Sequence, residues 1–241
     1  MKIIHEFVPT RKFLEIAEEV KDLADGWNVT DSPAGIPAPS GTVVSCVLKT
    51  KYPNKIVIPI FILHYKSPVE VGGLALAADA VGLDGLLLTM GDLPKYGEPI
   101  KMLKSSEEAR EFLRSNVRLK NLKLGALLTA RRSVEDNIAR VRDAWDFIFF
   151  MRLEDKTFSI LEQVAQECKS LNKPIYTYIL VRTPNNAETI QMIGWPVTTS
   201  INRVEEYVAK LDGVVDGVIA TCAGDHEGDK ELLEKLQRFR K

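Results

Sequence analysis

Short apolar runs alternate with amphipathic segments along the whole chain, and this alternation constrains the fold more than any other feature. The apolar runs have the length and the β-branched or aromatic content of buried strands, and the segments between them repeat apolar residues at helical spacing. The expected strands lie at 2–8, 27–31, 56–65, around 86–88, 122–129, 146–152, 174–181 and 216–222. Strand–helix pairs of this number, with no linker, predict an α/β protein with a single (β/α)8 TIM barrel, and residues 1–241 are expected to form one domain.

Helical spacing places a helix after each of these strands. The helices are expected at 11–25, 42–51, 68–81, from 105 onward, 133–143, 156–171, near 190, 201–211 and 230–240. Two of the starts have capping-box spacing, in which a serine is followed three residues later by an acid: Ser105 with Glu108, and Ser133 with Asp136. Start signals therefore support the periodicity in these two helices.

The charge balance narrows the classes of partner. Lysine and arginine together number 32 and aspartate and glutamate 33, so the formal net charge is -1 and no global field attracts nucleic acid or an anionic membrane. Small molecules or other proteins are the expected partners. The three cysteines lack the spacing of a zinc site or redox pair, and MKIIHEFVPTRK is not a signal peptide, so the sequence predicts a cytoplasmic protein with free thiols.

Polar residues follow several of the expected strands, at the carboxyl ends where parallel barrels place their sites. Glu6 comes from the first strand, and Asp92 follows the leucine-rich fourth strand directly after Gly91. Two carboxylic acids at one rim suit proton transfer, because burial raises the pKa of one of them toward the working pH. The alternative is an ion pair of Glu6 with Arg11 or Arg182. Gly91 either lets the backbone turn sharply or approach a ligand closely, or it is an ordinary turn glycine.

Histidine is the other chemically active residue type at this rim. His64 ends the third strand, where it is a hydrogen-bond donor to a cofactor ring, an acid–base group or a histidine satisfied by the protein itself. His5, Cys222 and His226 lie near the same rim, but they lack metal-ligand spacing, and the neighbours His5 and Glu6 point to opposite faces of their strand. No metal site is expected. The GxGxxG, P-loop, GxSxG and HExxH motifs are absent from the sequence.

Several short segments resemble, in the same order, those of the methylenetetrahydrofolate reductases, a family of flavin-bearing (β/α)8 barrels. They are HEFVPTR, NVTDSPAG, ILHY, LLTMGDLP, DFIFFMRLED and KPIYTYILV, and their order and spacing cover most of the chain. The resemblance implies an oxidoreductase of one-carbon metabolism, in which reduced FAD passes a hydride to a methylene-pterin and a methyl-pterin is formed. The implied substrate is a folate or another reduced pterin, and NAD(P)H or an electron-donor protein reloads the flavin.

The same resemblance implies roles for individual residues. Glu6 is the general acid that assists opening of the methylene bridge, and Asp92 lies near both the flavin and the pterin. Thr30 and His64 touch the flavin, and Gly91 belongs to the same cofactor-binding segment as Asp92.

The chain also departs from the family at several places. Arg140 replaces a lysine of the family's fifth helix in cofactor binding, Met151 stands at the position of a glutamine that contacts the pterin, and GALLTARRSVED replaces a Tyr-Pro-Glu-x-His segment that contacts the flavin. Two alternatives therefore stay open. One is a pterin-binding methyl-transfer or other one-carbon enzyme without flavin, and the other is a non-catalytic barrel subunit of a larger complex. The sequence also leaves open whether identical copies of the chain associate into a homo-oligomer.

Overall fold

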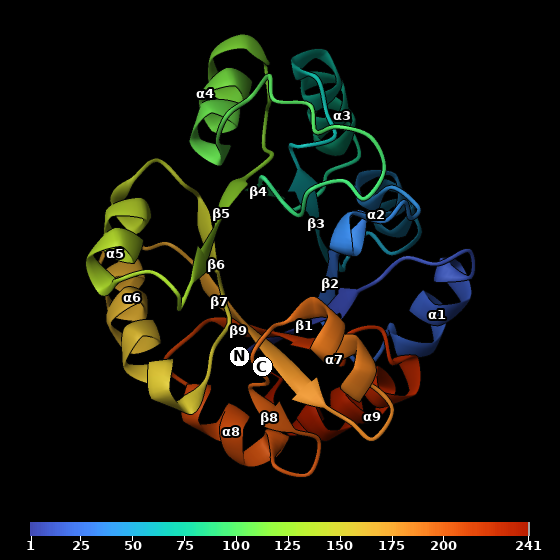
Figure 1. The fold of residues 1–241 in the computed structure, drawn as a ribbon, viewed down its shortest axis with the longest axis vertical. Coiled ribbons are helices and arrows are strands. Elements are labelled where there is room, and N and C mark those ends of the chain that lie inside the picture. Colours follow the sequence, from blue (N-terminus) through green and yellow to red (C-terminus); the bar gives the residue numbers. More distant parts are fainter. Residues whose placement is uncertain (241) are drawn as a thin grey trace. The chain divides into compact units, whose positions relative to one another are not determined.

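The computed structural model describes residues 1–240 and shows parallel strands connected by helices (Figure 1). The strands pair in the order β6-β5-β4-β3-β2-β1-β9-β7-β8, and an additional pairing of β6 with β7 closes the sheet. The fold is a single (β/α)8 barrel, so the predicted fold class is confirmed.

All of the expected strands are present, and one very short strand is added to them. The strands are β1 (Lys2–Phe7), β2 (Gly26–Val29), β3 (Ile56–Ile62), β4 (Leu86–Thr89), β5 (Leu124–Thr129), β6 (Phe147–Met151), β7 (Ile175–Arg182), β8 (Thr199–Ser200) and β9 (Gly217–Thr221). The two residues of β8 pair in parallel with Val181 and Arg182 at the end of β7. Two residues are too few to show an alternation pattern, and the sequence therefore did not predict β8.

The helices follow the strands as expected, and their ends differ most from the expected ones in two cases. They are α1 (Phe13–Val20), α2 (Gly41–Lys51), α3 (Pro68–Ala80), α4 (Ser106–Asn116), α5 (Val134–Arg142), α6 (Phe158–Ser170), α7 (Ala187–Ile193), α8 (Val204–Leu211) and α9 (His226–Leu236), with short 3-10 helices at Pro33–Gly35, Asp155–Thr157 and Gln237–Phe239. The first helix is shorter than the expected range 11–25. The last begins before the expected residue 230, because the Asp225 side chain accepts a hydrogen bond from the Gly228 N–H at 3.2 Å and caps the helix.

The two predicted capping serines act as expected. The Ser105 hydroxyl accepts a hydrogen bond from the Glu108 N–H at 3.1 Å, and the Glu108 carboxylate accepts one from the Lys104 N–H at 2.7 Å. The Ser133 hydroxyl likewise accepts from the Asp136 N–H at 3.1 Å. These side chains satisfy amide groups that have no partner inside the helix, which fixes where α4 and α5 begin.

The chain divides into two compact units. The first comprises residues 1–6, 18–26 and those from 127 onward, and the second comprises 7–17 and 27–126. In the first unit β9 pairs with both β1 and β7, and Ile219 of β9 is the partner of Ile4 on β1 and of Tyr178 on β7. This parallel register brings the carboxyl ends of the three strands to the same place.

The second unit contains a buried ion pair. The Lys66 ammonium lies 2.7 Å from the Asp31 carboxylate, and both side chains are less than a tenth exposed. Lys66 also donates to the Ile62 carbonyl at 2.9 Å, and its Nζ lies 4.9 Å from the centre of the Phe61 ring. Asp31 accepts a further bond from the Gly41 N–H at 3.4 Å. Both charges are therefore buried, and each is paired with the other. This pairing offsets the free-energy cost of removing the two charges from water.

Gly91 occupies a backbone position that favours glycine. Its φ is +75°, in the left-handed region, and a Cβ built on it would lie 2.6 Å from Cγ2 of Ile62. Both observations agree with the turn role that the sequence left open, because an L-residue here meets backbone strain and a steric overlap together.

We expect Gly91→Ala to destabilise the fold more than Gly82→Ala does. Gly82 has nearly the same φ, +74°, but open space around its Cβ position, so its substitution carries only the backbone cost of about 1–2 kcal/mol. Gly91→Ala adds the overlap with Ile62, which costs about a further 1–3 kcal/mol. Urea denaturation of both variants measures the difference. Equal losses in the two would show that Ile62 yields without cost.

Candidate functional site

Glu6 is a buried carboxyl group of the first unit that forms no ion pair among residues 1–240. Glu6 lies near the end of β1 and is 8% exposed. Burial raises the pKa of this carboxyl to about 7, against an opposing hydrogen bond from the Thr221 hydroxyl of β9. The Asp229 carboxylate raises the pKa further, and His5 lowers it. The carboxyl group is thus poised to hold or release a proton near neutral pH.

Tyr178 of β7 is the second polar group of this cluster. Its side chain is 3% exposed, and burial together with the nearby Glu6 raises the pKa of its phenol well above the ordinary value. The phenol therefore stays protonated and is able to donate a hydrogen bond. Its ring meets those of Phe149 and Trp195 edge to face, with centroids 5.9 and 6.3 Å apart, so the donor stands in an aromatic wall.

A buried pair lies beside this cluster: His5, which directly precedes Glu6 in the sequence, and Asp229. The His5 Nε2 lies 3.3 Å from an Asp229 carboxylate oxygen, and both side chains are almost fully buried. The other Asp229 oxygen accepts a hydrogen bond from the Cys222 N–H at 2.6 Å. Asp229 belongs to the first turn of α9, so this pair ties the end of β1 to the loop and helix that follow β9.

The arrangement suits general acid–base chemistry. A carboxyl group whose pKa lies near 7 can give a proton to a bound molecule or take one from it, and a protonated phenol can hold the oxygen of that molecule. Within residues 1–240 no cation forms an ion pair with Glu6, so the alternative of a pair with Arg11 or Arg182 is not what the structure has. The catalytic role of Glu6 stays a prediction.

Asp92 and Thr30, predicted beside the ligands, lie in the second unit. One Asp92 carboxylate oxygen accepts a hydrogen bond from the Ala34 N–H at 3.1 Å, and its carbonyl accepts one from the Tyr65 hydroxyl at 2.7 Å. The Asp92 side chain is exposed. Thr30 is buried, and its hydroxyl donates to the Phe7 carbonyl at 3.5 Å. These bonds fold the loop and strand ends, and the predicted contacts of both residues with a ligand remain predictions.

The other predicted binding residues have different surroundings. His64, also in the second unit, is half-buried, and its Nδ1 is buried without a hydrogen-bond partner among residues 1–240. Arg140 of α5 donates to the Leu127 carbonyl at 3.2 Å, a bond that ties the helix to β5. Met151 ends β6 with 8% of its surface exposed. Glu6, Arg140 and Met151 thus belong to the first unit, and Thr30, His64, Gly91 and Asp92 to the second.

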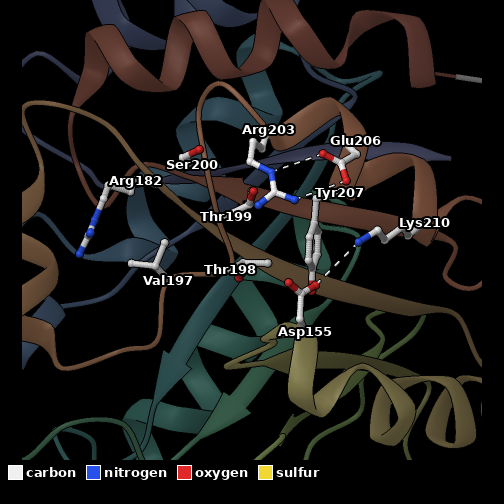
Figure 2. Close-up of a pocket in the computed structure, with 10 residues that line it drawn as sticks. All are labelled: Asp155, Arg182, Val197, Thr198, Thr199, Ser200, Arg203, Glu206, Tyr207 and Lys210. Carbon is white, nitrogen blue, oxygen red and sulfur yellow. Dashed lines mark hydrogen bonds and ion pairs between the residues drawn. The ribbon is translucent and has the colours of Figure 1, made fainter.

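Sequence reasoning missed Tyr178 and a cavity of about 280 Å³ in the first unit. The cavity is shown in Figure 2 and is lined by Asp155, Arg182, Val197, Thr198, Thr199, Ser200, Arg203, Glu206, Tyr207 and Lys210. Its α8 residues recur at the spacing of one helix face, which is the signal that could have grouped them. Tyr178 stood in a strand that was expected, but its direction there depends on the register with β9.

Within residues 1–240 no group of three or more histidine, cysteine, aspartate or glutamate side chains is placed to hold a metal ion. None of the helices in that range is long and apolar enough to cross a membrane.

Comparison with known proteins gives structural matches only. No family model and no curated protein matches the sequence. A protein from Aquifex aeolicus VF5 is 14% identical with a TM-score of 0.65, over 100% of this chain and 93% of that chain. The tryptophan synthase alpha subunit of Campylobacter jejuni is 15% identical with a TM-score of 0.59, over 97% and 94%. A mutant tryptophan synthase alpha subunit of Pyrococcus furiosus is 14% identical with a TM-score of 0.63, over 98% and 96%. Such identities show the fold alone.

The identification as a methylenetetrahydrofolate reductase is wrong. No family model supports it, and several similar structures are tryptophan synthase alpha subunits or contain one. The predicted oxidoreductase function, with its flavoprotein and folate description, is therefore also wrong, and so are the one-carbon alternatives. The six segments misled because apolar strands that end in Gly, Asp or His recur wherever parallel barrels build a rim. FAD binding rested on the same resemblance and remains an untested prediction.

We expect Glu6→Gln to remove a pH dependence of stability. Because the folded-state pKa of Glu6, about 7, exceeds the ordinary 4.5, the folded protein holds a proton that the unfolded chain has lost between these two values. Wild-type stability therefore falls as pH rises from 4.5 to 7, by roughly 3 kcal/mol from this group.

Urea denaturation at pH 4.5, 5.5, 6.5 and 7.5 measures this effect as the difference between wild type and Glu6→Gln. The exposed Glu19→Gln on α1 is the control and should follow the wild type throughout. Parallel pH profiles of wild type and Glu6→Gln would show that the carboxyl is ionised in the folded protein across this range.

Proposed function

We propose that the protein is a lyase-type enzyme that acts on a small molecule by acid–base chemistry, with Glu6 as its proton-transfer group. The observation that carries this proposal is the buried Glu6 carboxyl, whose pKa of about 7 lies where a general acid or base works best at neutral pH. The register of β1, β9 and β7 holds this group beside donors from two neighbouring strands.

Each group of the cluster has a distinct task in such a reaction. Glu6 gives a proton to the reacting atom or takes one from it. The Tyr178 phenol, kept protonated by its burial, donates a hydrogen bond to an oxygen on which negative charge develops. The Thr221 hydroxyl donates a hydrogen bond to the Glu6 carboxylate and so stabilises its ionised form. Glu6 can therefore still lose its proton near neutral pH.

The reaction balances without an electron donor or acceptor. One carbon–carbon bond of the substrate breaks, and its electron pair stays on the carbon of one fragment. The proton from Glu6 neutralises that fragment, while the other fragment loses a proton as its new double bond forms. The proton lost restores the Glu6 carboxyl, directly or through solvent.

The structural neighbours support one part of this proposal. Several of them are tryptophan synthase alpha subunits, which share the (β/α)8 barrel over nearly the whole chain. Other matches are the tryptophan synthase complex of Pyrococcus furiosus, described there as an α2β2 assembly with mutual activation. At 13–15% identity the substrate of this chain is not carried over from them. The neighbours support only a small-molecule substrate, and the acid–base chemistry is proposed from Glu6 itself.

We expect the purified protein to split a component of a metabolite extract from its own organism into two products whose masses add up to that of the substrate. In deuterated water one product should gain a carbon-bound deuterium, because the proton comes from an exchangeable carboxyl. Glu6→Gln should lower the rate by roughly 10²–10⁴-fold, the usual worth of a general acid or base, and mass spectrometry follows both effects.

Two variants sharpen this experiment. Tyr178→Phe keeps the ring in its aromatic wall and removes only the donor, so it should lower the rate with little loss of stability. Glu19→Gln should leave the rate unchanged. A product that differs from its substrate by two hydrogens, or two products whose masses together exceed that of the substrate by one water, would overturn the lyase assignment, and a full rate in Glu6→Gln would remove Glu6 from the mechanism.

A further inference from the structure

The cavity at α8 is lined mainly by charged and hydroxyl side chains, and several of their hydrogen-bond donors make no hydrogen bond within residues 1–240. Figure 2 shows Arg203, Tyr207 and Lys210 along one side of it, Asp155 below them and Arg182 on the other side. We propose that this cavity binds a small organic anion through its phosphate or carboxylate group, at a place separate from Glu6.

Tyr207 gives the first reason. Its side chain is 4% exposed and lines the cavity, yet its hydroxyl has no hydrogen-bond partner among residues 1–240. Burial, and then the nearby carboxylates of Asp155 and Glu154, raises the pKa of this hydroxyl, so it stays protonated. A buried O–H without a partner is destabilising, and what relieves it is an acceptor supplied from outside the chain.

The charges of the lining give the second reason. Three cations, Arg182, Arg203 and Lys210, and two carboxylates, Asp155 and Glu206, line the cavity, and the nearby Glu154 is paired with Lys156. Within residues 1–240 the Arg182 guanidinium forms no ion pair or side-chain hydrogen bond, so the lining keeps a net positive charge. Arg182 presents the forked donors that match a phosphate or a carboxylate.

The two ion pairs of the lining do not block the site. The Arg203 Nε lies 3.4 Å from Glu206, and the Lys210 Nζ lies 3.9 Å from Asp155. All four side chains are about half exposed or more, and such pairs are weak in water. An incoming anion can therefore share the Arg203 and Lys210 donors without a large cost.

Hydroxyl groups and size complete the description. The side chains of Thr199 and Ser200, on β8, are half-buried in the lining, and neither makes a hydrogen bond within residues 1–240. Hydroxyls beside a guanidinium are common partners of anionic oxygens. A volume of about 280 Å³ is at the small end for ligand sites, which favours an anion of a few carbon atoms over a nucleotide.

The test uses the full chain, with inorganic phosphate and succinate as probes in separate calorimetric titrations at low ionic strength. We expect saturable binding of one anion per chain for at least one probe, and the tighter probe identifies the preferred group. Tyr207→Phe and Arg182→Gln should each weaken binding about tenfold, the worth of one hydrogen bond to a charged group. Arg142→Gln, on α5 and paired with Glu167, is the matched control and should bind as the wild type does.

A second readout does not depend on affinity. Without anion, Tyr207→Phe should be as stable as the wild type or more so, because it removes a buried polar atom that lacks a partner. Addition of phosphate or succinate should then raise the melting temperature of the wild type more than that of the variant. Lower stability of the anion-free variant, absence of saturation with both probes, or equal affinity in all three variants would overturn the proposal. Each of these results is obtained without turnover, so the failure of the lyase proposal would leave this one standing.

Discussion

Removal of one carboxyl group from water is the constraint on which the functional reading of this fold depends. Burial alone pushes the pKa of Glu6 upward, and the Thr221 hydroxyl pulls it part of the way back, so the result is about 7 and not a permanently neutral acid. The balance depends on parallel register: β9 lies between β1 and β7, and the three strands end together. A shift of that register by one residue would turn Thr221 away from the acid.

One strand serves both the acid–base cluster and the cavity at α8. Tyr178 and Arg182 lie on β7 at positions of the same parity, roughly 13 Å apart along the strand, with Tyr178 near Glu6 and Arg182 at the cavity. Beyond the main sheet β7 continues into its pairing with β8, whose hydroxyl residues also line that cavity. The shortest strand of the fold therefore has a clear structural use.

Periodicity and caps were enough to predict most of the backbone from the sequence. Strands buried on both faces, such as β6, and the capping serines 105 and 133 carry their signals within a few residues. β8 was missed because two residues show no period, and the start of α9 because its sequence, HEGDK, has no apolar residue.

The site was harder to predict than the fold, since it depends on distances between strands. The sequence singled out Glu6 and the tendency of burial to raise a pKa, but not Tyr178, whose relation to Glu6 appears only with the register. The family resemblance failed for a related reason. Segments of four to ten residues describe how a strand ends at a barrel rim, and unrelated barrels share that requirement.

The buried pair of Lys66 and Asp31 has a consequence for how this chain can vary. Replacing either residue alone leaves the other charge buried without a partner, which lowers the free energy of unfolding by about 3–5 kcal/mol. Replacing both by apolar residues of similar size changes the stability little. Single-site libraries would therefore score both positions as intolerant. Only a library that changes both positions together would find variants in which two uncharged residues replace the ion pair.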